Sequence, residues 1–346
     1  MYPGFEDGEM GIFKFAGFGI TAPDGGMGFG YADGGYTWWT DFLFQGMFAA
    51  TAGTIISGAV AGRIKINAFM LIVFLYVLIV YPIVGSWQWG GGFLSTFTDE
   101  VGFYDFAGST LVHSVGGWGG LVIIYLLGAR KGKFDSSGKA VAIPGSNIPL
   151  SAAGVLILWL GWFGFNGGSV LSADPANTSL VLVTTCLAAA AGGLGASFLS
   201  SLMYKNLDIT MFMNGVLGGM VGITAGADQM GPTDAILIGA IGGAIVVLGV
   251  ALLDKCKLDD PVGAIPVHLF AGIWGTLAVG LFGASSGFDQ FMVQLASTGI
   301  VGAFCIVGAA IIALIVKSIM GLRVSDEEEE IGLDISEHGT KAYFSS

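Results

Sequence analysis

Nine long stretches of apolar residues, separated by short polar connections, fill this sequence from residue 42 onward. Each is close to the roughly 20 residues that a helix needs to cross about 30 Å of hydrocarbon. The stretch at 209–227 is the weakest of them, because it is short and rich in glycine. The pattern predicts an all-α integral membrane protein with nine spans, at 42–61, 67–86, 106–128, 148–166, 179–203, 209–227, 235–253, 262–284 and 295–316.

Composition excludes several other classes of protein. Charged residues make up only 11% of the 346 residues, whereas an average soluble domain carries about a quarter. A soluble enzyme and a disordered chain are therefore excluded, and the net charge of −12 argues against nucleic acid as a partner. The 59 glycines show no collagen repeat and favour membrane helices whose backbones approach closely. The cysteines have no metal-binding spacing, so no metal site and no cofactor are predicted.

The basic residues predict the orientation of the chain. Twelve of the 13 Lys and Arg residues follow alternate spans, and the other connections between spans contain none. By the positive-inside rule the side that carries them is cytoplasmic, so the N-terminus is predicted outside and the C-terminus inside. We therefore expect a Gly-rich extracellular or periplasmic segment at 1–40, a transmembrane domain at 41–320 and a cytoplasmic tail at 321–346.

Two segments resemble each other and run in opposite directions under this topology. They are DFAGSTLVHSVGGWGG at 105–120 and DPVGAIPVHLFAGIWG at 260–275, each with Asp followed by His eight positions later. Such a pair is the signature of inverted-topology repeats with a site near the middle of the membrane. Eight helical residues rise about 12 Å, so His113 and His268 should meet near the centre of a core about 30 Å thick.

Two interpretations of this histidine pair are open. A single buried histidine is often a structural residue bonded to a carbonyl, whereas a matched pair favours function, because ionisable groups are costly in a bilayer. Imidazoles are poor ligands for sodium or potassium ions, but they exchange hydrogen bonds and protons near neutral pH. The pair therefore suits a small polar solute that is neutral or becomes neutral in transit, such as ammonia, water or urea.

Aromatic residues near the outer ends of the spans indicate a cation site. Trp89 precedes an outer connection, Phe44 and Phe48 lie near the outer end of the first span, and Phe165 and Ser169 lie where the fourth span ends. The face of an aromatic ring attracts a cation, and a hydroxyl accepts a hydrogen bond from it. The alternative is the belt of aromatic residues found at any membrane interface.

These motifs resemble the ammonium transporter (Amt/Mep/Rh) family, and its bacterial and archaeal Amt branch in particular. The resemblance rests on DFAGSTLVH, GWFGFNGGS, DDPVGAIPVHLFAGIWG and GLRVSDEEEEIGLDISEHGTKAY, and it runs from about residue 40 to the C-terminus. It implies an ammonium-transporter-like bundle that takes up nitrogen as a homotrimer, multi-pass in the inner (plasma) membrane. Family members usually have eleven spans, so we expect this chain to lack the first two.

The resemblance also implies roles for particular residues on the outer side. Trp89 and Ser169 resemble the site that recruits ammonium, with Phe44 as an added aromatic wall. Asp105 resembles an aspartate that organises the recruitment site without binding the ion directly.

Deeper residues receive roles in the same way. Phe48 and Phe165 resemble a stacked phenyl gate, and His113 and His268 resemble the paired histidines of the pore. The resemblance implies that ammonium loses its proton and crosses as ammonia. It also implies that the tail regulates flux and meets a PII-type signal protein.

Two other functions compete with transport. The acidic run from Asp326 to Glu330 is compatible with an ammonium sensor that signals through its tail, or simply with a solvated acidic tail. A membrane enzyme or metal site built on the histidines would need carboxylates or thiolates beside them. Cys186 and Cys305 are the spare intramembrane candidates, and neither shares a motif with a histidine. We therefore do not expect an enzyme.

Overall fold

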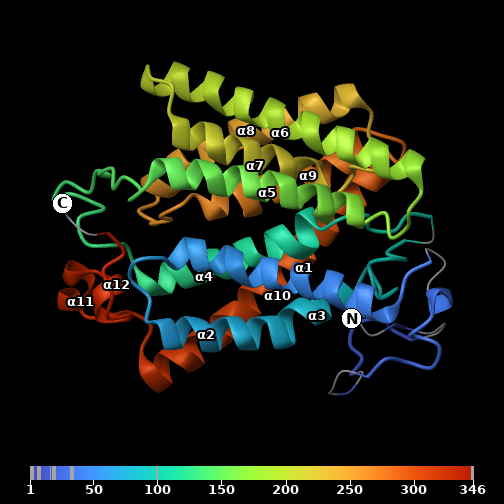
Figure 1. The fold of residues 1–346 in the computed structure, drawn as a ribbon, viewed down its shortest axis with the longest axis horizontal. Coiled ribbons are helices and arrows are strands. Elements are labelled where there is room, and N and C mark those ends of the chain that lie inside the picture. The colour runs from blue at the N-terminus through green and yellow to red at the C-terminus, as the bar shows by residue number, and fades with distance from the viewer. Residues whose placement is uncertain are drawn as a thin grey trace.

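The computed structural model describes residues 4–5, 9–15, 17, 21–31, 35–98 and 100–343. Parts of the predicted segments 1–40 and 321–346 therefore lie outside the described residues. In the described part of the chain the regular structure is helical (Figure 1). The helices are η1 (Phe29–Tyr31), α1 (Trp38–Val60), α2 (Ile66–Leu75), η2 (Tyr76–Val80), α3 (Tyr81–Ser86), η3 (Ser109–Ser114), α4 (Val115–Leu127), α5 (Ile148–Gly168), α6 (Pro175–Tyr204), α7 (Ile209–Thr224), α8 (Pro232–Lys255), η4 (Ile265–Phe270), α9 (Ala271–Leu281), α10 (Phe288–Met320), α11 (Asp326–Ile331) and α12 (Leu333–Ser336).

The all-helical membrane architecture predicted from the sequence is confirmed. Each of the nine predicted stretches overlaps a helix or a continuous run of helices. Among the described residues, seven of these segments are long and apolar enough to cross a membrane. The other two, Ile209–Thr224 and Ile265–Leu281, are apolar but shorter.

The predicted starts of the two histidine segments are wrong by three residues. Helical structure was expected from 106 and 262, but the segments begin at Ser109 and Ile265. Gly108 (φ 105°) and Gly263 (φ 76°) adopt left-handed backbone conformations just before these points. A right-handed helix cannot continue back through such a residue, so each histidine segment starts inside the bundle.

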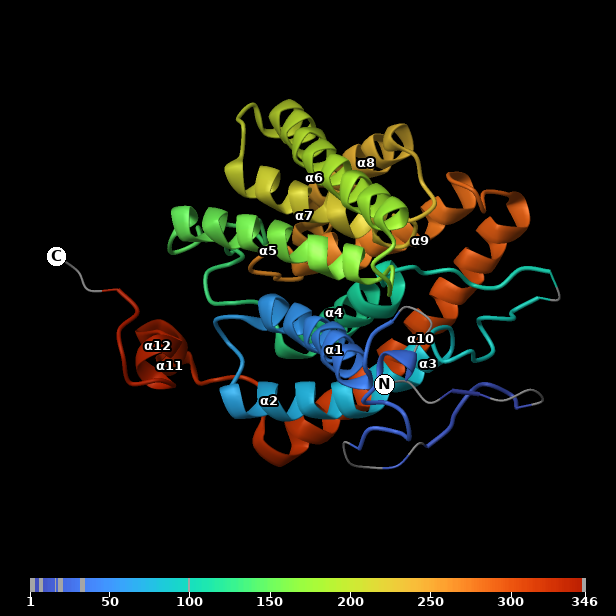
Figure 2. The ribbon, with the colours of Figure 1, turned by 45° about the vertical axis from the view of Figure 1, so that its right-hand side comes forward.

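Glycine allows three helices on one side of the bundle to pack with their backbones in contact. Figure 2 shows α6, α7 and α8 together on one side, with α1, α2 and α10 on the other. A Cβ atom on Gly243 of α8 would fall on the carbonyl oxygen of Gly192 of α6. A Cβ atom on Gly219 of α7 would fall on the carbonyl oxygen of Ala188. Small residues at these crossings therefore set the distance between the helices.

Nine of the 13 Lys and Arg residues lie in the connections at one end of the bundle, which we call the basic end (61–65, 128–147, 205–208 and 255–264). Here the buried Arg63 donates to the carbonyl oxygens of Gly128 and Asp259. Arg130 forms two hydrogen bonds with the Asp259 carboxylate through Nε (2.8 Å) and Nη2 (2.9 Å). Burial acts to raise the pKa of Asp259, but the hydrogen bonds from Arg130 outweigh it and hold the pKa below its usual value. These contacts tie together the connections that follow α1, α4 and α8.

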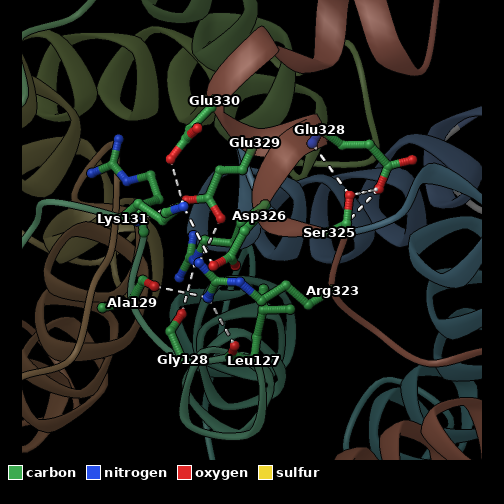
Figure 3. Close-up of polar contacts among 12 residues, drawn as sticks. Leu127, Gly128, Ala129, Lys131, Arg323, Ser325, Asp326, Glu328, Glu329 and Glu330 are labelled. Carbon is green, nitrogen blue, oxygen red and sulfur yellow. Dashed lines mark hydrogen bonds and ion pairs between the residues drawn. The ribbon is translucent and has the colours of Figure 1, made fainter.

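The C-terminal tail lies against the basic end (Figure 3). Lys131 Nζ pairs with Glu330 (2.6 Å) and Asp326 (3.3 Å) of α11. Arg323 pairs with Glu329 (2.6 Å) and also donates to the carbonyl oxygens of Leu127 and Ala129 at the end of α4. The acidic run is therefore docked on the connection between α4 and α5.

We predict that Gly243→Ala destabilises the bundle by about 1–3 kcal/mol, because the added methyl group overpacks a backbone crossing. The measurement is the thermal midpoint of the detergent-solubilised protein. Gly154→Ala on α5 is the matched control, since a Cβ atom there meets nothing within 4 Å. Equal midpoints for the two variants would show that the crossing tolerates a larger separation.

Candidate functional site

Asp105 organises the start of the first histidine segment. Its side chain is fully buried and accepts four backbone N–H groups, those of Gly108, Ser109, Thr110 and Leu111. The first N–H groups of a helix have no partner within the helix, and burying them unpaired would cost free energy. The carboxylate therefore allows a helix to begin inside the bundle.

Asp260 holds the corresponding place in the second segment. Its carboxylate accepts the N–H groups of Gly263 (3.1 Å) and Ile265 (2.7 Å). The neighbouring Asp259 contacts Arg130, which follows α4, so the second segment begins where the first one ends. The two segments are therefore antiparallel in space.

The two predicted pore histidines lie in contact. The Nδ1 atoms of His113 and His268 are 3.2 Å apart. His113 is 1% exposed, whereas His268 is half-buried. His113 Nε2 is also buried and has no hydrogen-bond partner among the described residues. This nitrogen therefore keeps an unused hydrogen-bonding capacity.

Trp162 is a neighbour of this pair that the sequence analysis missed. Its ring lies over His113, with ring centroids 5.0 Å apart and planes 19° apart. Its Nε1 donates to the Thr224 hydroxyl (3.0 Å), which fixes the orientation of the indole. Trp162 stands three positions before Phe165, and residues at this spacing share a helix face. The spacing from Phe165 could therefore have indicated Trp162 as a site residue from the sequence alone.

Phe48 and Phe165 stack in parallel next to the histidines. Their ring centroids are 4.0 Å apart and their planes differ by 1°. The Phe165 centroid is 5.4 Å from that of His113, while Phe48 lines a cavity on the other side. The stacked rings therefore separate this cavity from the histidines.

The cavity beyond the phenyl rings has a volume of about 280 Å³ and contains the predicted outer residues Trp89, Ser169 and Phe44. We call it the aromatic cavity. Trp89 Nε1 donates to the Asp105 carbonyl oxygen (2.9 Å), which holds the indole in place. The Ser169 hydroxyl donates to the Phe165 carbonyl oxygen (2.8 Å), so its oxygen remains as an acceptor. Asp105 itself does not line the cavity.

Other residues of the aromatic cavity were not among the predicted site residues. They are Tyr31, Asp41, Gln45, Phe106 and Leu171. Asp41 and Gln45 lie on the same face of α1 as Phe44 and Phe48, at helical spacing. Tyr31 comes from the segment before α1, and nothing in its sequence spacing indicates that it reaches this cavity.

The chain resembles known proteins along most of its length. Residues 9–343 match the family described as the Ammonium Transporter Family. The chain belongs to the ammonium transporter family. This confirms the resemblance drawn from the four sequence motifs.

Relatives within the family include bacterial and archaeal proteins. A protein of Synechocystis is 41% identical, over 96% of this chain and 66% of its own length. The ammonium transporter Amt2 of Archaeoglobus fulgidus is 42% identical, over 87% of this chain and 69% of its own length. The chain thus spans slightly less than two thirds of the Synechocystis relative. The archaeal relative is named as a transporter and not as an enzyme.

Solved structures of the family share this fold. A structure described as a sensor Amt protein superposes with a TM-score of 0.86 at 33% identity, covering 97% of this chain and 83% of that chain. Mep2 of Saccharomyces cerevisiae gives a TM-score of 0.76 at 28% identity, covering 85% of this chain and 68% of that chain. Among the residues described here, no group of three or more His, Cys, Asp or Glu side chains is placed to hold a metal ion.

We predict that Asp105→Asn lowers the stability of the protein by about 1–3 kcal/mol, because an amide nitrogen would face two of the N–H donors. Asp260→Asn is the matched comparison and should cost less, since Asp260 is half-buried with well-formed bonds from Gly263 (3.1 Å) and Ile265 (2.7 Å), whereas Asp105 is fully buried and accepts four such bonds at 2.8–2.9 Å. Thermal midpoints in detergent measure both. A larger loss for Asp260→Asn would contradict this account.

Proposed function

We propose that this protein transports ammonium or ammonia across the cytoplasmic membrane through a pore that passes His113 and His268. The observation that carries the proposal is the order of three features along one path. The aromatic cavity comes first, the Phe48–Phe165 stack second and the histidine pair third. The phenyl rings thus stand between the aromatic cavity, which suits a cation, and the histidine pair, which suits a neutral solute.

Recruitment would take place in the aromatic cavity. The rings of Trp89, Phe44 and Phe48 provide electron-rich faces, and the Ser169 oxygen accepts a hydrogen bond. An ammonium ion has four N–H donors for such partners. Asp105 would contribute by holding Trp89 in place and not by binding the ion.

Passage beyond the stacked rings would require loss of the proton, which would pass to solvent water on the outer side of the rings. The rings of Phe48 and Phe165 offer no polar partner to a cation, so a charged ion would meet a large desolvation cost there. Neutral ammonia could then exchange hydrogen bonds with the imidazoles of His113 and His268. A potassium ion has no proton to lose and would be excluded.

Several features of the assembly belong to the same proposal. We expect the basic end to face the cytoplasm and the aromatic cavity to face outside. On this view residues 1–40 are an outer segment, 41–320 form the transporter domain and 321–346 are a regulatory tail. We also expect a homotrimer with one pore per subunit and contact between the tail and a PII-type protein. The transporter names of the relatives support flux over a role as a sensor alone.

Replacing both His113 and His268 with Ala should lower methylammonium uptake about tenfold, which corresponds to losing about one hydrogen bond to the solute during passage. Uptake is measured in cells that lack their own ammonium transporters. His338→Ala, in the tail, is the control and should leave uptake unchanged. Full uptake by the double variant would refute the role of the imidazoles.

The docked tail gives a second prediction. Lys131→Glu places like charges beside Asp326 and Glu330, so the tail should detach more often. We expect proteolysis of the tail to accelerate, and uptake to fall, by about two- to fivefold, which matches the free energy of exposed ion pairs.

Two further variants control this experiment. Combining Lys131→Glu with Glu330→Lys should restore both readouts, because opposite charges face each other again. Lys139→Glu changes an exposed lysine of the same connection for which no ion pair is found in the described part of the chain, and it should have no effect. Unchanged proteolysis in Lys131→Glu would show that the ion pairs do not hold the tail.

A further inference from the structure

We propose that Asp41, oriented by Tyr31, collects cations at the mouth of the aromatic cavity and so sets the apparent affinity for ammonium. This inference rests on the proposed transport function. Asp41 lies outside the four family motifs and would add a fixed negative charge to the outer site. Asp41 would act by raising the local concentration of the cation and not by taking its proton.

Asp41 lies between two adjacent cavities. It lines the aromatic cavity together with Phe48 and Trp89. It also lines a second cavity of about 310 Å³, whose other walls include Tyr36 just before α1 and Ser172 in the connection after α5. Asp41 is seven residues before Phe48 on α1, or about 10 Å along the helix. A cation moving from the second cavity toward the phenyl rings would therefore pass the carboxylate.

Tyr31 fixes the position of this carboxylate. Its hydroxyl donates to Asp41 Oδ2 at 3.2 Å, and both residues are half-buried. Burial, and then the nearby Asp41 charge, raise the pKa of Tyr31 to about 12, so the hydroxyl keeps its proton at physiological pH. The hydrogen bond holds one carboxylate oxygen and leaves further acceptor capacity for a cation.

The surroundings of Asp41 favour a cation as its occupant. In the described part of the chain, no ion pair joins Asp41 to a Lys or Arg side chain. Gln45, one turn further along α1, lines the same cavity. Its Oε1 atom is buried and has no hydrogen-bond partner among the described residues. The cavity therefore offers a carboxylate and aromatic faces, with the unpaired Gln45 Oε1 atom buried in its wall, and a carboxylate beside aromatic faces attracts a small ion with N–H donors.

A purely structural role for Asp41 is the competing explanation. The residue stands in the first turn of α1, where a negative charge stabilises the helix dipole. This role would appear in the thermal midpoint of the protein and not in the concentration dependence of uptake. The two explanations therefore predict different measurements.

The test is the concentration dependence of methylammonium uptake by the full chain in cells without their own ammonium transporters. We expect Asp41→Asn to raise KM about fivefold, which corresponds to losing one unit charge about 4 Å from the cation in water. The maximal rate should change by less than about twofold on the same argument. Asp41→Glu keeps the charge and should retain the wild-type KM, while Tyr31→Phe should give a smaller rise than Asp41→Asn. Raising the ionic strength should narrow the difference between wild type and Asp41→Asn.

Asp289→Asn is the matched control. Asp289 is also an acidic residue in the first turn of a long helix, α10, but it is exposed and does not line either cavity. Its replacement should leave KM unchanged. Equal KM values for Asp41→Asn, Asp289→Asn and the wild type would overturn this inference, as would a lower thermal midpoint of Asp41→Asn with an unchanged KM. Absence of uptake by the wild type would instead overturn the transport function itself.

Discussion

The structure depends on how polar backbone groups are satisfied where two helices begin inside an apolar bundle. A buried N–H group left unpaired there would cost free energy. Asp105 and Asp260 supply the missing acceptors. The glycines before each helix allow the chain to turn onto its carboxylate. A pair of aspartates thus determines where both histidine segments start.

This capping arrangement explains why the histidines meet. The two segments run in opposite directions and begin at equivalent distances after their aspartates, so His113 and His268 are brought to the same depth. Their Nδ1 contact leaves His113 Nε2 without a protein partner among the described residues. Trp162 stacks on the face of His113, which restricts the orientation of that ring. Under the proposed function, the imidazoles would be held in place while a solute passes them.

The sequence predicted that His113 and His268 lie close together, but not the contacts that surround them. Hydrophobic length located the nine helical segments, and the Asp–His spacing paired the histidines correctly although it assumed helical structure from 106 and 262. The error was the same in both segments, but the segments are antiparallel, so the two errors in depth add, and the direct contact of the two rings could not be predicted from the spacing. The parallel stacking of Phe48 on Phe165 and the approach of Tyr31 to Asp41 depend on contacts between segments far apart in the chain. The spacing of residues along a single sequence does not show which distant segments come into contact, so neither contact could be predicted from it.

The distribution of charge adds a constraint that links the two ends of the bundle. The predicted spans contain no Asp, Glu, Lys or Arg, so apart from Asp105 and Asp260, which cap the histidine segments, formal charges lie toward the ends. At the basic end, Arg63 and Arg130 share the Asp259 carboxylate, and that charge is neutralised within the protein. Asp41, at the other end, has no basic partner in the described residues, so its charge remains available to a mobile cation. Under the proposed function, a cation is therefore favoured on the outer side of the phenyl rings and disfavoured beyond them. Selectivity would arise at that boundary, because only an ion that can leave its charge behind as a proton can continue.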